Sequence, residues 1–295
     1  MIENRIKPTT ANFFWEGPIS NYEISSINSF VRHGFNVNLW TYSKNPEWNM
    51  LSGIEIKDAN QILPVNMLTQ LNQNLQKSNY SSFSNLFRYR LLEEYGGWWF
   101  DTDCICMKNV DDFVNLTKER DYVLGLERKD YVGSAIMYFQ DISLLMKIQE
   151  HAYKIIENNN FKLKWGQIGP DLITEIVILD GLIDNILSPS YFFPISPNKV
   201  NVFFDSILKP NDQSKLYNSF VTHTWNEMFR KYNINKTIMP PDKSFLFNEF
   251  KKNNVLIGTK NKQYSKLFKF RFYPVISLFF KIFSRLKVTI NNFKK

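Results

Sequence analysis

Residues 84–103 decide the fold class; they read SNLFRYRLLEEYGGWWFDTD. Apolar residues recur at helical spacing over residues 82–95, which predicts a helix. Gly96 and Gly97 follow and end that helix. The next three residues are bulky and apolar, which predicts a short buried strand over residues 98–100. A helix that feeds directly into a buried strand is typical of α/β proteins.

Four polar residues of this stretch carry the candidate chemistry. The helix places Asn85 and Arg88 one turn apart, and the strand delivers Asp101 and Asp103 to its carboxyl end, where open α/β sheets bind ligands. Two such carboxylates can hold a hard divalent cation, which in turn binds a diphosphate. Arg88 can supply a forked set of donors to a phosphate or a sugar. In the alternative interpretation the two acids only cap a turn, since a bare D-x-D pattern is common by chance.

The residues before this stretch predict a βαβ unit. A strand is expected over residues 9–15, a helix from the N-cap Ser20 to Gly34, and strands over residues 36–42 and 54–56. Strand, helix and strand at this spacing predict a mainly parallel sheet flanked by helices.

The residues after it predict further strands over 122–126, 135–139 and 218–223. Helices are expected over residues 141–158 and from Gly169 onward, with Pro170 in the first turn. Residues 188–197, SPSYFFPISP, contain too much proline for regular structure to be expected.

Composition excludes several classes of protein. The 295 residues are 44% hydrophobic and 22% charged, the balance of a globular chain. Cys104 and Cys106 are the only cysteines and there are three histidines, which excludes a disulfide scaffold and a four-cysteine zinc site. The first residues contain no apolar core of a signal peptide, and no apolar stretch is long enough to cross a membrane. We therefore expect the protein to stay in the cytoplasm.

Charge is divided unevenly between two parts of the chain. Residues 1–250 carry 24 basic and 28 acidic side chains, whereas residues 251–295 carry twelve basic and no acidic ones. From Pro274 the sequence PVISLFFKIFSRLKVTI also predicts an amphipathic helix rich in phenylalanine. We expect a catalytic domain over residues 1–250 and a basic C-terminal extension over 251–295 that binds an anionic membrane surface. The alternative is a C-terminal helix packed on the domain.

The central block resembles a known family. RYRLLEEYGGWWFDTD is similar to the signature of glycosyltransferases whose sugar-binding region contains a DXD motif, among them initiating mannosyltransferases and many bacterial capsule and lipopolysaccharide enzymes. The family pattern is S-D-x-x-R-Y, a spacer, then G-G-x-Y-x-D-x-D. This chain departs from it at Asn85, where the family has an acid, and at Trp99, where it has tyrosine. The segments FFWEGPIS, which contains Trp15, and FVTHTW, residues 220–225, also resemble family elements.

The resemblance implies a GT-A fold and a metal-dependent, retaining transfer of a sugar from a nucleotide donor. Asp103 would bind Mn²⁺ or Mg²⁺ directly, with His223 as a further ligand and Asp101 on the ribose, the sugar or the metal. The nucleotide-sugar donor would be bound by Trp15, Asn85, Arg88 and Gly97. Of these, Trp15 would stack on the base.

Purely structural roles stay open for three of these residues. His223 can be a structural residue, Trp15 can belong to the core, and Arg88 can pair with Glu94 on its own helix.

The resemblance also implies the partners. The donor would be a UDP- or GDP-sugar that carries a hexose or N-acetylhexosamine. The acceptor would be a polysaccharide or a lipid-linked saccharide at the cytoplasmic face of the membrane.

Two other functions compete with the transferase. A haloacid-dehalogenase-like phosphatase would use Asp101 as nucleophile, with Asp180 and Asp184 as its second acidic motif. A basic nucleic-acid-binding protein would use the tail, but the acidic body argues against a nucleic-acid partner.

Overall fold

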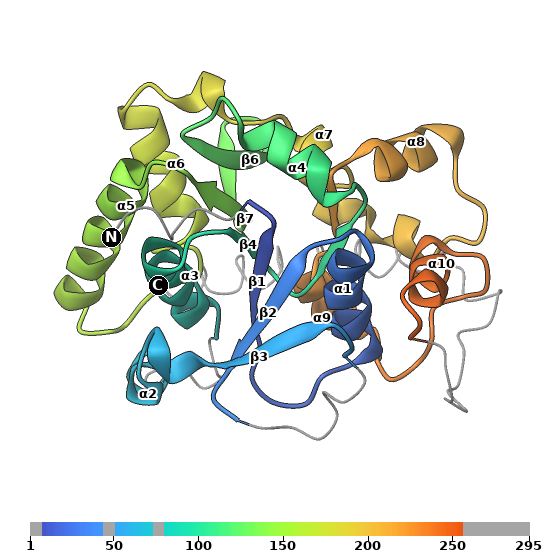
Figure 1. Cartoon of the computed structure of the whole chain (residues 1–295), viewed down its shortest axis with the longest axis horizontal. Helices are drawn as coiled ribbons and strands as arrows, with labels where there is room; N and C mark the ends of the chain where they lie inside the picture. The colour runs from blue at the N-terminus through green and yellow to red at the C-terminus, as the bar shows by residue number, and fades with distance from the viewer. Residues whose placement is uncertain (1–7, 44–50, 73–79, 256–295) are drawn as a thin grey trace, which may run out of the picture.

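A six-stranded sheet forms the centre of the computed structural model, which describes residues 8–43, 51–72 and 80–255 (Figure 1). Its strand order is β3-β2-β1-β4-β7-β6, and β5 and β8 form a separate two-stranded sheet. The strand bounds are β1 Thr10–Phe14, β2 Asn36–Thr41, β3 Ile54–Asp58, β4 Trp98–Phe100, β5 Cys104–Cys106, β6 Tyr122–Arg128, β7 Tyr131–Phe139 and β8 Val221–His223.

The direction of the strands sets where a site can form. β1, β2, β3 and β4 are parallel, β7 is antiparallel to β4, and β6 is antiparallel to β7. Because two reversals cancel, β6 points the same way as β4. The carboxyl ends of β1, β2, β4 and β6 therefore meet at one edge of the sheet, and the predicted mainly parallel α/β architecture is confirmed.

Helices cover both faces of this sheet. In Figure 1, α3, α5 and α6 lie on one side of it, and α1 and α10 lie on the other. Each face has its own apolar core, and side chains of β1 alternate between them, with Phe13 in one core and Phe14 in the other. The helix bounds are α1 Asn21–Arg32, α2 Val65–Asn72, α3 Tyr80–Glu94, α4 Val110–Thr117, α5 Ser143–Asn158, α6 Pro170–Leu179, α7 Pro189–Phe192, α8 Pro210–Asn218, α9 Asn226–Lys231 and α10 Phe245–Lys252, with 3₁₀ turns η2 Ala59–Gln61, η3 Ile183–Asn185 and η4 Pro197–Phe204.

Local sequence fixes the ends of the two helices nearest the site. α1 begins at a capping box, in which the Ser20 hydroxyl accepts from the Tyr22 amide and Glu23 accepts from the Ser20 amide. α3 ends at Gly96 and Gly97, whose φ angles of 69° and 76° lie in the left-handed region that favours glycine. Both boundaries agree with the sequence prediction.

A small sheet brings a distant part of the chain to the end of β4. β5 pairs antiparallel with β8, and Cys104 lies opposite His223. α1 supports this sheet, since the Ser26 hydroxyl donates to the Cys104 carbonyl at 2.5 Å and the Cys106 amide donates to the Ser29 hydroxyl at 2.8 Å. Both cysteines are buried and unbonded to each other. The expected last strand thus exists as the partner of β5.

The expectation of no regular structure over residues 188–197 is wrong. Pro189 begins α7, and Pro197 begins η4. Proline is tolerated in the first turn of a helix, because the amide it lacks has no partner there. The prolines therefore start two short helices in this segment.

The C-terminal end of the described chain packs on α1. The Asn253 side-chain amide donates to the Ser25 carbonyl at 3.0 Å, and Arg32 pairs with Glu249 at 3.0 Å. The helix α10 thus runs through the expected boundary at residue 250. The predicted amphipathic extension falls almost wholly on residues 256–295, which lie outside the described residues. Among the residues described, no helix is long and apolar enough to cross a bilayer.

Candidate active site

The two aspartates lie where β4 ends at the carboxyl edge of the sheet. The Asp101 amide donates to the Ala135 carbonyl at 2.8 Å, so the ladder with β7 extends one residue past β4. A tight turn follows, in which the Cys104 amide donates to the Asp101 carbonyl at 3.1 Å. The chain then enters β5. This turn separates the two carboxylates and gives each a different set of partners.

Asp101 is held by α3 and by its own strand. Its Oδ1 lies 3.1 Å from Arg88 Nη2 and accepts from the Trp99 indole at 2.8 Å. The Arg88 side chain is only 3% exposed, and its guanidinium also donates to the Ser84 carbonyl, the Ser84 hydroxyl and the Ser134 carbonyl. Because nearly every donor of Arg88 is engaged within the protein, its role here is to position Asp101. Glu94, the alternative partner, pairs with Arg90.

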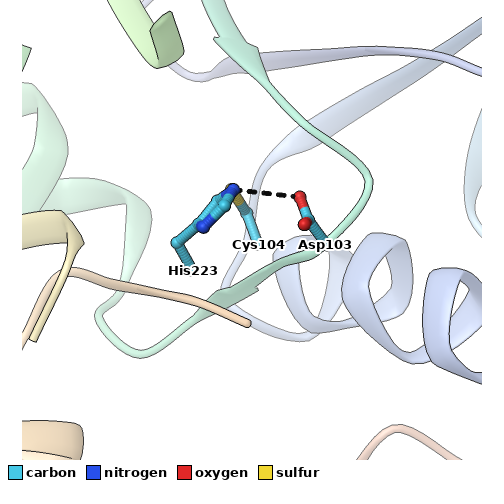
Figure 2. A group of neighbouring side chains, drawn as sticks. All are labelled: Asp103, Cys104 and His223. Atoms are coloured by element: carbon cyan, nitrogen blue, oxygen red, sulfur yellow. Dashed lines mark ion pairs between the residues drawn. The ribbon is translucent and has the colours of Figure 1, made fainter. Parts of the chain in front are cut away.

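Asp103 is held by the segment around β8. Its Oδ1 lies 3.2 Å from His223 Nε2 (Figure 2). Its Oδ2 accepts from the backbone amide of Asn226 at 2.8 Å. The Thr224 amide donates to the Asp103 carbonyl at 2.8 Å. Residues more than a hundred positions apart therefore meet, and His223, predicted as a further metal ligand, lies beside Asp103.

The protonation states follow from these contacts. Burial alone would lower the pKa of His223, but the charge and hydrogen bond of Asp103, together with the charges of Asp101 and Glu127, raise it. Burial alone would raise the pKa of Asp103, yet His223 and the Asn226 amide bring it below its ordinary value. For Asp101, burial outweighs the attraction of Arg88, so its pKa is raised. The two carboxylates are thus electrostatically distinct.

The donor atoms fit a divalent cation. Among the described residues, one group of potential ligands gathers within 4.8 Å, and it consists of Asp103, Cys104 and His223. Figure 2 shows the three side chains converging. Asp101 stands outside this group, although it was predicted as a ligand. Burial raises the pKa of the Cys104 thiol well above its ordinary value, which disfavours the thiolate that would bind a metal. A carboxylate and an imidazole remain as the natural ligands.

The structure brings one of the predicted donor-binding residues, Asn85, to the site and leaves another, Gly97, away from it. Asn85 is buried beside the site, where its Oδ1 accepts from the Ser134 hydroxyl at 3.4 Å and its amide packs against Gly169. Gly97 lies at the opposite end of β4 from Asp101, close to the Thr10 carbonyl and the Asn12 side chain. The structure therefore brings Asn85 to Arg88 but does not bring Gly97 to the carboxylates.

Trp15 lies directly after β1 and is partly buried. Its indole donates to the Pro18 carbonyl at 3.2 Å, and the Lys236 ammonium lies 5.8 Å from its ring. Lys236 also pairs with Glu23, a fully buried carboxylate that accepts from Asn226 at 2.9 Å. Since Asn226 in turn binds Asp103, a continuous polar network links Trp15 to the metal-binding candidates.

Sequence reasoning missed four residues around the site, and no spacing marks them. Cys104, Asn226 and Lys236 reach it through the β5–β8 pairing and the loop that follows α9. Glu127 reaches it from the carboxyl end of β6. The packing of its side chain beside Gly133 and Phe193 is the signal that identifies Glu127, and that packing is not visible in the sequence.

Residues 20–121 match the family model described as a glycosyltransferase sugar-binding region containing a DXD motif. This matched region is similar to that family. It contains Asn85, Arg88, Asp101 and Asp103, so the predicted resemblance is confirmed where it is most specific. Asp180, which with Asp184 would form the second acidic motif of the phosphatase alternative, pairs with Lys147 at 2.6 Å between α5 and α6.

The chain also resembles curated glycosyltransferases. It is 27% identical over 156 residues to the lactosylceramide 4-alpha-galactosyltransferase of Mus musculus, a match that covers 49% of this chain and 40% of the relative. The enzyme of the same name from Pongo pygmaeus is 26% identical, with 49% and 66% covered. The chain therefore spans between two fifths and two thirds of these relatives' lengths.

One solved structure shows the same fold over most of the chain. The bifunctional glycosyltransferase WbbM in its apo form matches with a TM-score of 0.50 and 12% identity, covering 88% of this chain and 50% of that one. Similarity at this identity concerns the fold alone. It confirms the predicted GT-A-like α/β architecture.

Proposed function

We propose that this protein is a metal-dependent glycosyltransferase that moves a sugar from a nucleotide-sugar donor to a saccharide acceptor. The observation that carries the proposal is the convergence of Arg88, Asp101, Asp103 and His223 at the carboxyl edge of the sheet, three of them within the matched family region. Asp103 and His223 lie together only because β8 pairs with β5. That arrangement has no function in a chain whose DXD motif merely caps a turn.

Asp103 and His223 would hold the cation. Their mixed oxygen and nitrogen donors suit Mn²⁺ better than Mg²⁺, which prefers oxygen ligands alone. When bound, the cation supplies Lewis-acid stabilisation to the charge on the departing nucleoside diphosphate. Arg88 would keep the Asp101 carboxylate oriented toward the donor. Trp15 would stack on the base, and Lys236 beside it would attract the diphosphate.

The sugar is proposed to be a hexose, with galactose the first to test because the relatives named above are galactosyltransferases. We propose retention of anomeric configuration and an acceptor of the polysaccharide or lipid-linked kind, as in capsule or lipopolysaccharide synthesis. The basic tail over residues 251–295 would hold the enzyme on the cytoplasmic face of the membrane, where lipid-linked acceptors lie.

A donor screen tests this function. UDP-galactose, UDP-glucose, UDP-N-acetylglucosamine and GDP-mannose are each incubated with the full chain and Mn²⁺, and release of nucleoside diphosphate is measured. At least one donor should be hydrolysed, and a chelator should stop the reaction. No release from any donor would contradict the proposal. A phosphorylated Asp101 after incubation with a phosphate ester would favour the phosphatase instead.

A further inference from the structure

Glu127 stands at the same edge of the sheet as the two aspartates. It is the last residue but one of β6, which points the same way as β4. Only β7 separates the two strands, since Asp101 bonds to Ala135 and Leu126 lies opposite Val132. Neighbouring strands are about 4.8 Å apart, so β4 and β6 lie about 10 Å apart across the sheet. A glutamate side chain that leans inward spans part of that distance.

The side chain lies on the face of the sheet that carries His223. A methyl group added to Gly133 would come within 2.9 Å of Glu127 Cγ and 2.5 Å of Phe193 Cζ. The bare backbone of Gly133 therefore makes room for Glu127 beside the Phe193 ring. That ring lies 5.4 Å from the His223 ring, centroid to centroid. Glu127, Phe193 and His223 thus follow one another along one wall of the site.

Among the residues that the structure describes, no hydrogen bond or ion pair holds the Glu127 carboxylate. Burial raises its pKa, and the charges of His223 and Arg128 oppose that effect while those of Asp101 and Asp103 add to it. Glu127 in turn contributes to the raised pKa of His223. These mutual effects place the carboxylate within the electrostatic reach of the site.

The other carboxylates of the site are engaged. Asp101 is bound by Arg88 and Trp99, and Asp103 by His223 and Asn226. Glu23 is bound by Ser20, Asn226 and Lys236. A nucleophile must be free to approach carbon, and Glu127 meets that requirement.

We propose that Glu127 is the catalytic nucleophile of the transfer. This inference rests on the proposed function and on its retention of configuration, which requires two displacements at the anomeric carbon if each inverts it. In the first, a Glu127 oxygen bonds to the anomeric carbon while the bond from that carbon to the phosphate oxygen breaks, and the nucleoside diphosphate leaves with the electron pair. In the second, the acceptor oxygen bonds to the same carbon and the Glu127 carboxylate leaves. The acceptor's proton passes to a phosphate oxygen of the bound diphosphate.

Three variants of the full chain test the assignment with the donor that the wild type hydrolyses fastest. Glu127→Gln keeps the side chain's size and removes the nucleophile, so turnover should fall on the order of 10³-fold or more. Glu127→Ala should recover product formation when sodium azide is added. Glu119→Gln alters an exposed glutamate near the start of β6 and should leave turnover unchanged. Binding of the nucleoside diphosphate with Mn²⁺ should stay within a few-fold of wild type in every variant.

The reaction products show whether Glu127 acts as the nucleophile. Azide attacks once, so the glycosyl azide made by Glu127→Ala should have the configuration opposite to the donor's. Mass spectrometry of wild type quenched during turnover should find one hexose added to the peptide that contains Glu127. The inference is overturned by wild-type turnover in Glu127→Gln, by an adduct on Asp101, by an azide product with the donor's configuration, or by an inverted transfer product. Each of these four outcomes contradicts the role of Glu127 but is compatible with a glycosyltransferase. A wild-type protein that is inactive on all donors contradicts both proposals.

Discussion

Asp103 joins the motif to the rest of the site, because it contacts β8 through His223 and the start of α9 through Asn226. Asp103→Asn keeps the shape of the side chain and removes its charge. We expect donor hydrolysis to fall on the order of 10²–10³-fold, since the leaving diphosphate loses electrostatic stabilisation. Turnover at saturating Mn²⁺ measures the effect, and circular dichroism checks that the fold survives. A variant with wild-type turnover in the presence of a chelator would refute the metal site.

Arg88 is predicted to matter for stability as well as for activity. Arg88→Met leaves Asp101 without its buried partner, which should cost about 2–3 kcal/mol of unfolding free energy. Arg90→Met is the matched control on the same helix, because Arg90 pairs with Glu93 and Glu94 and its side chain is 31% exposed. That control should cost less than about 1 kcal/mol. Urea denaturation measures the free energy of unfolding of both variants. Equal losses of that free energy would show that the Arg88–Asp101 pair stabilises the fold no more than the exposed pairs of Arg90.

Residues of the site differ in how far the sequence reveals them. Arg88, Asp101 and Asp103 lie within twenty residues of one another, on a helix and a strand whose patterns are clear. His223 could be named only from the family resemblance, since it lies 120 residues after Asp103 in the chain. Glu127 could not be named at all, because its role depends on the face that β6 presents and on the absence of a side chain at Gly133.

At the scale of elements, the junction between α3 and β4 is the critical one. Gly97 has a φ of 76°, and an added methyl group would lie 3.0 Å from the Thr10 carbonyl oxygen and 3.1 Å from the Asn12 amide. Gly97→Ala should therefore destabilise the fold by about 2–3 kcal/mol, of which about 1–2 kcal/mol is the left-handed backbone alone. Gly181→Ala is the control, since Gly181 has a φ of 69° and open space around it. Thermal denaturation compares them, and identical losses would rule out the steric contribution.

Elements with strong periodicity were predicted with nearly correct bounds. β1, α1, β2, α3 and β4 each have clear apolar spacing and a recognisable start or end. The short helices α7 and η4 were missed, since four to eight residues carry little periodic signal and their prolines were taken as breakers. β5 was missed as well, because a three-residue strand is defined by its partner β8 rather than by its own sequence.

For the whole molecule, cation binding should depend on pH in one direction. Burial alone would lower the pKa of His223, but Asp103, Asp101 and Glu127 together raise it above its ordinary value. A larger fraction of the rings therefore carries a proton that a metal must displace. The apparent affinity for Mn²⁺ should therefore rise with pH, by up to about tenfold per unit below the pKa. Isothermal titration at pH 6, 7 and 8 measures this. His223→Gln should bind more weakly and with a flatter pH dependence, and an unchanged slope would exclude His223 as a ligand.

The charge distribution of the whole chain leads to a prediction for its C-terminal part. Twelve basic and no acidic residues over positions 251–295, together with Phe279, Phe280 and Phe283, form the pattern of an interfacial segment. Each cation near an anionic bilayer contributes about 1 kcal/mol, and apolar burial adds to that. The full chain should therefore sediment with vesicles that contain anionic phosphatidylglycerol and be released by salt.

Because α10 continues to Lys252 and Asn253 is bonded to Ser25, cutting the chain near residue 248 would disturb the catalytic domain. Glutamine at positions 281, 285 and 287 of the full chain is the sharper change, since it removes three charges from the segment and leaves α10 intact. That triple variant should bind anionic vesicles at least tenfold more weakly at 100 mM salt, while its hydrolysis of a soluble donor stays at the wild-type rate. If the triple variant and wild type bind equally, or if neither binds, the basic side chains of the tail do not anchor the protein to the membrane.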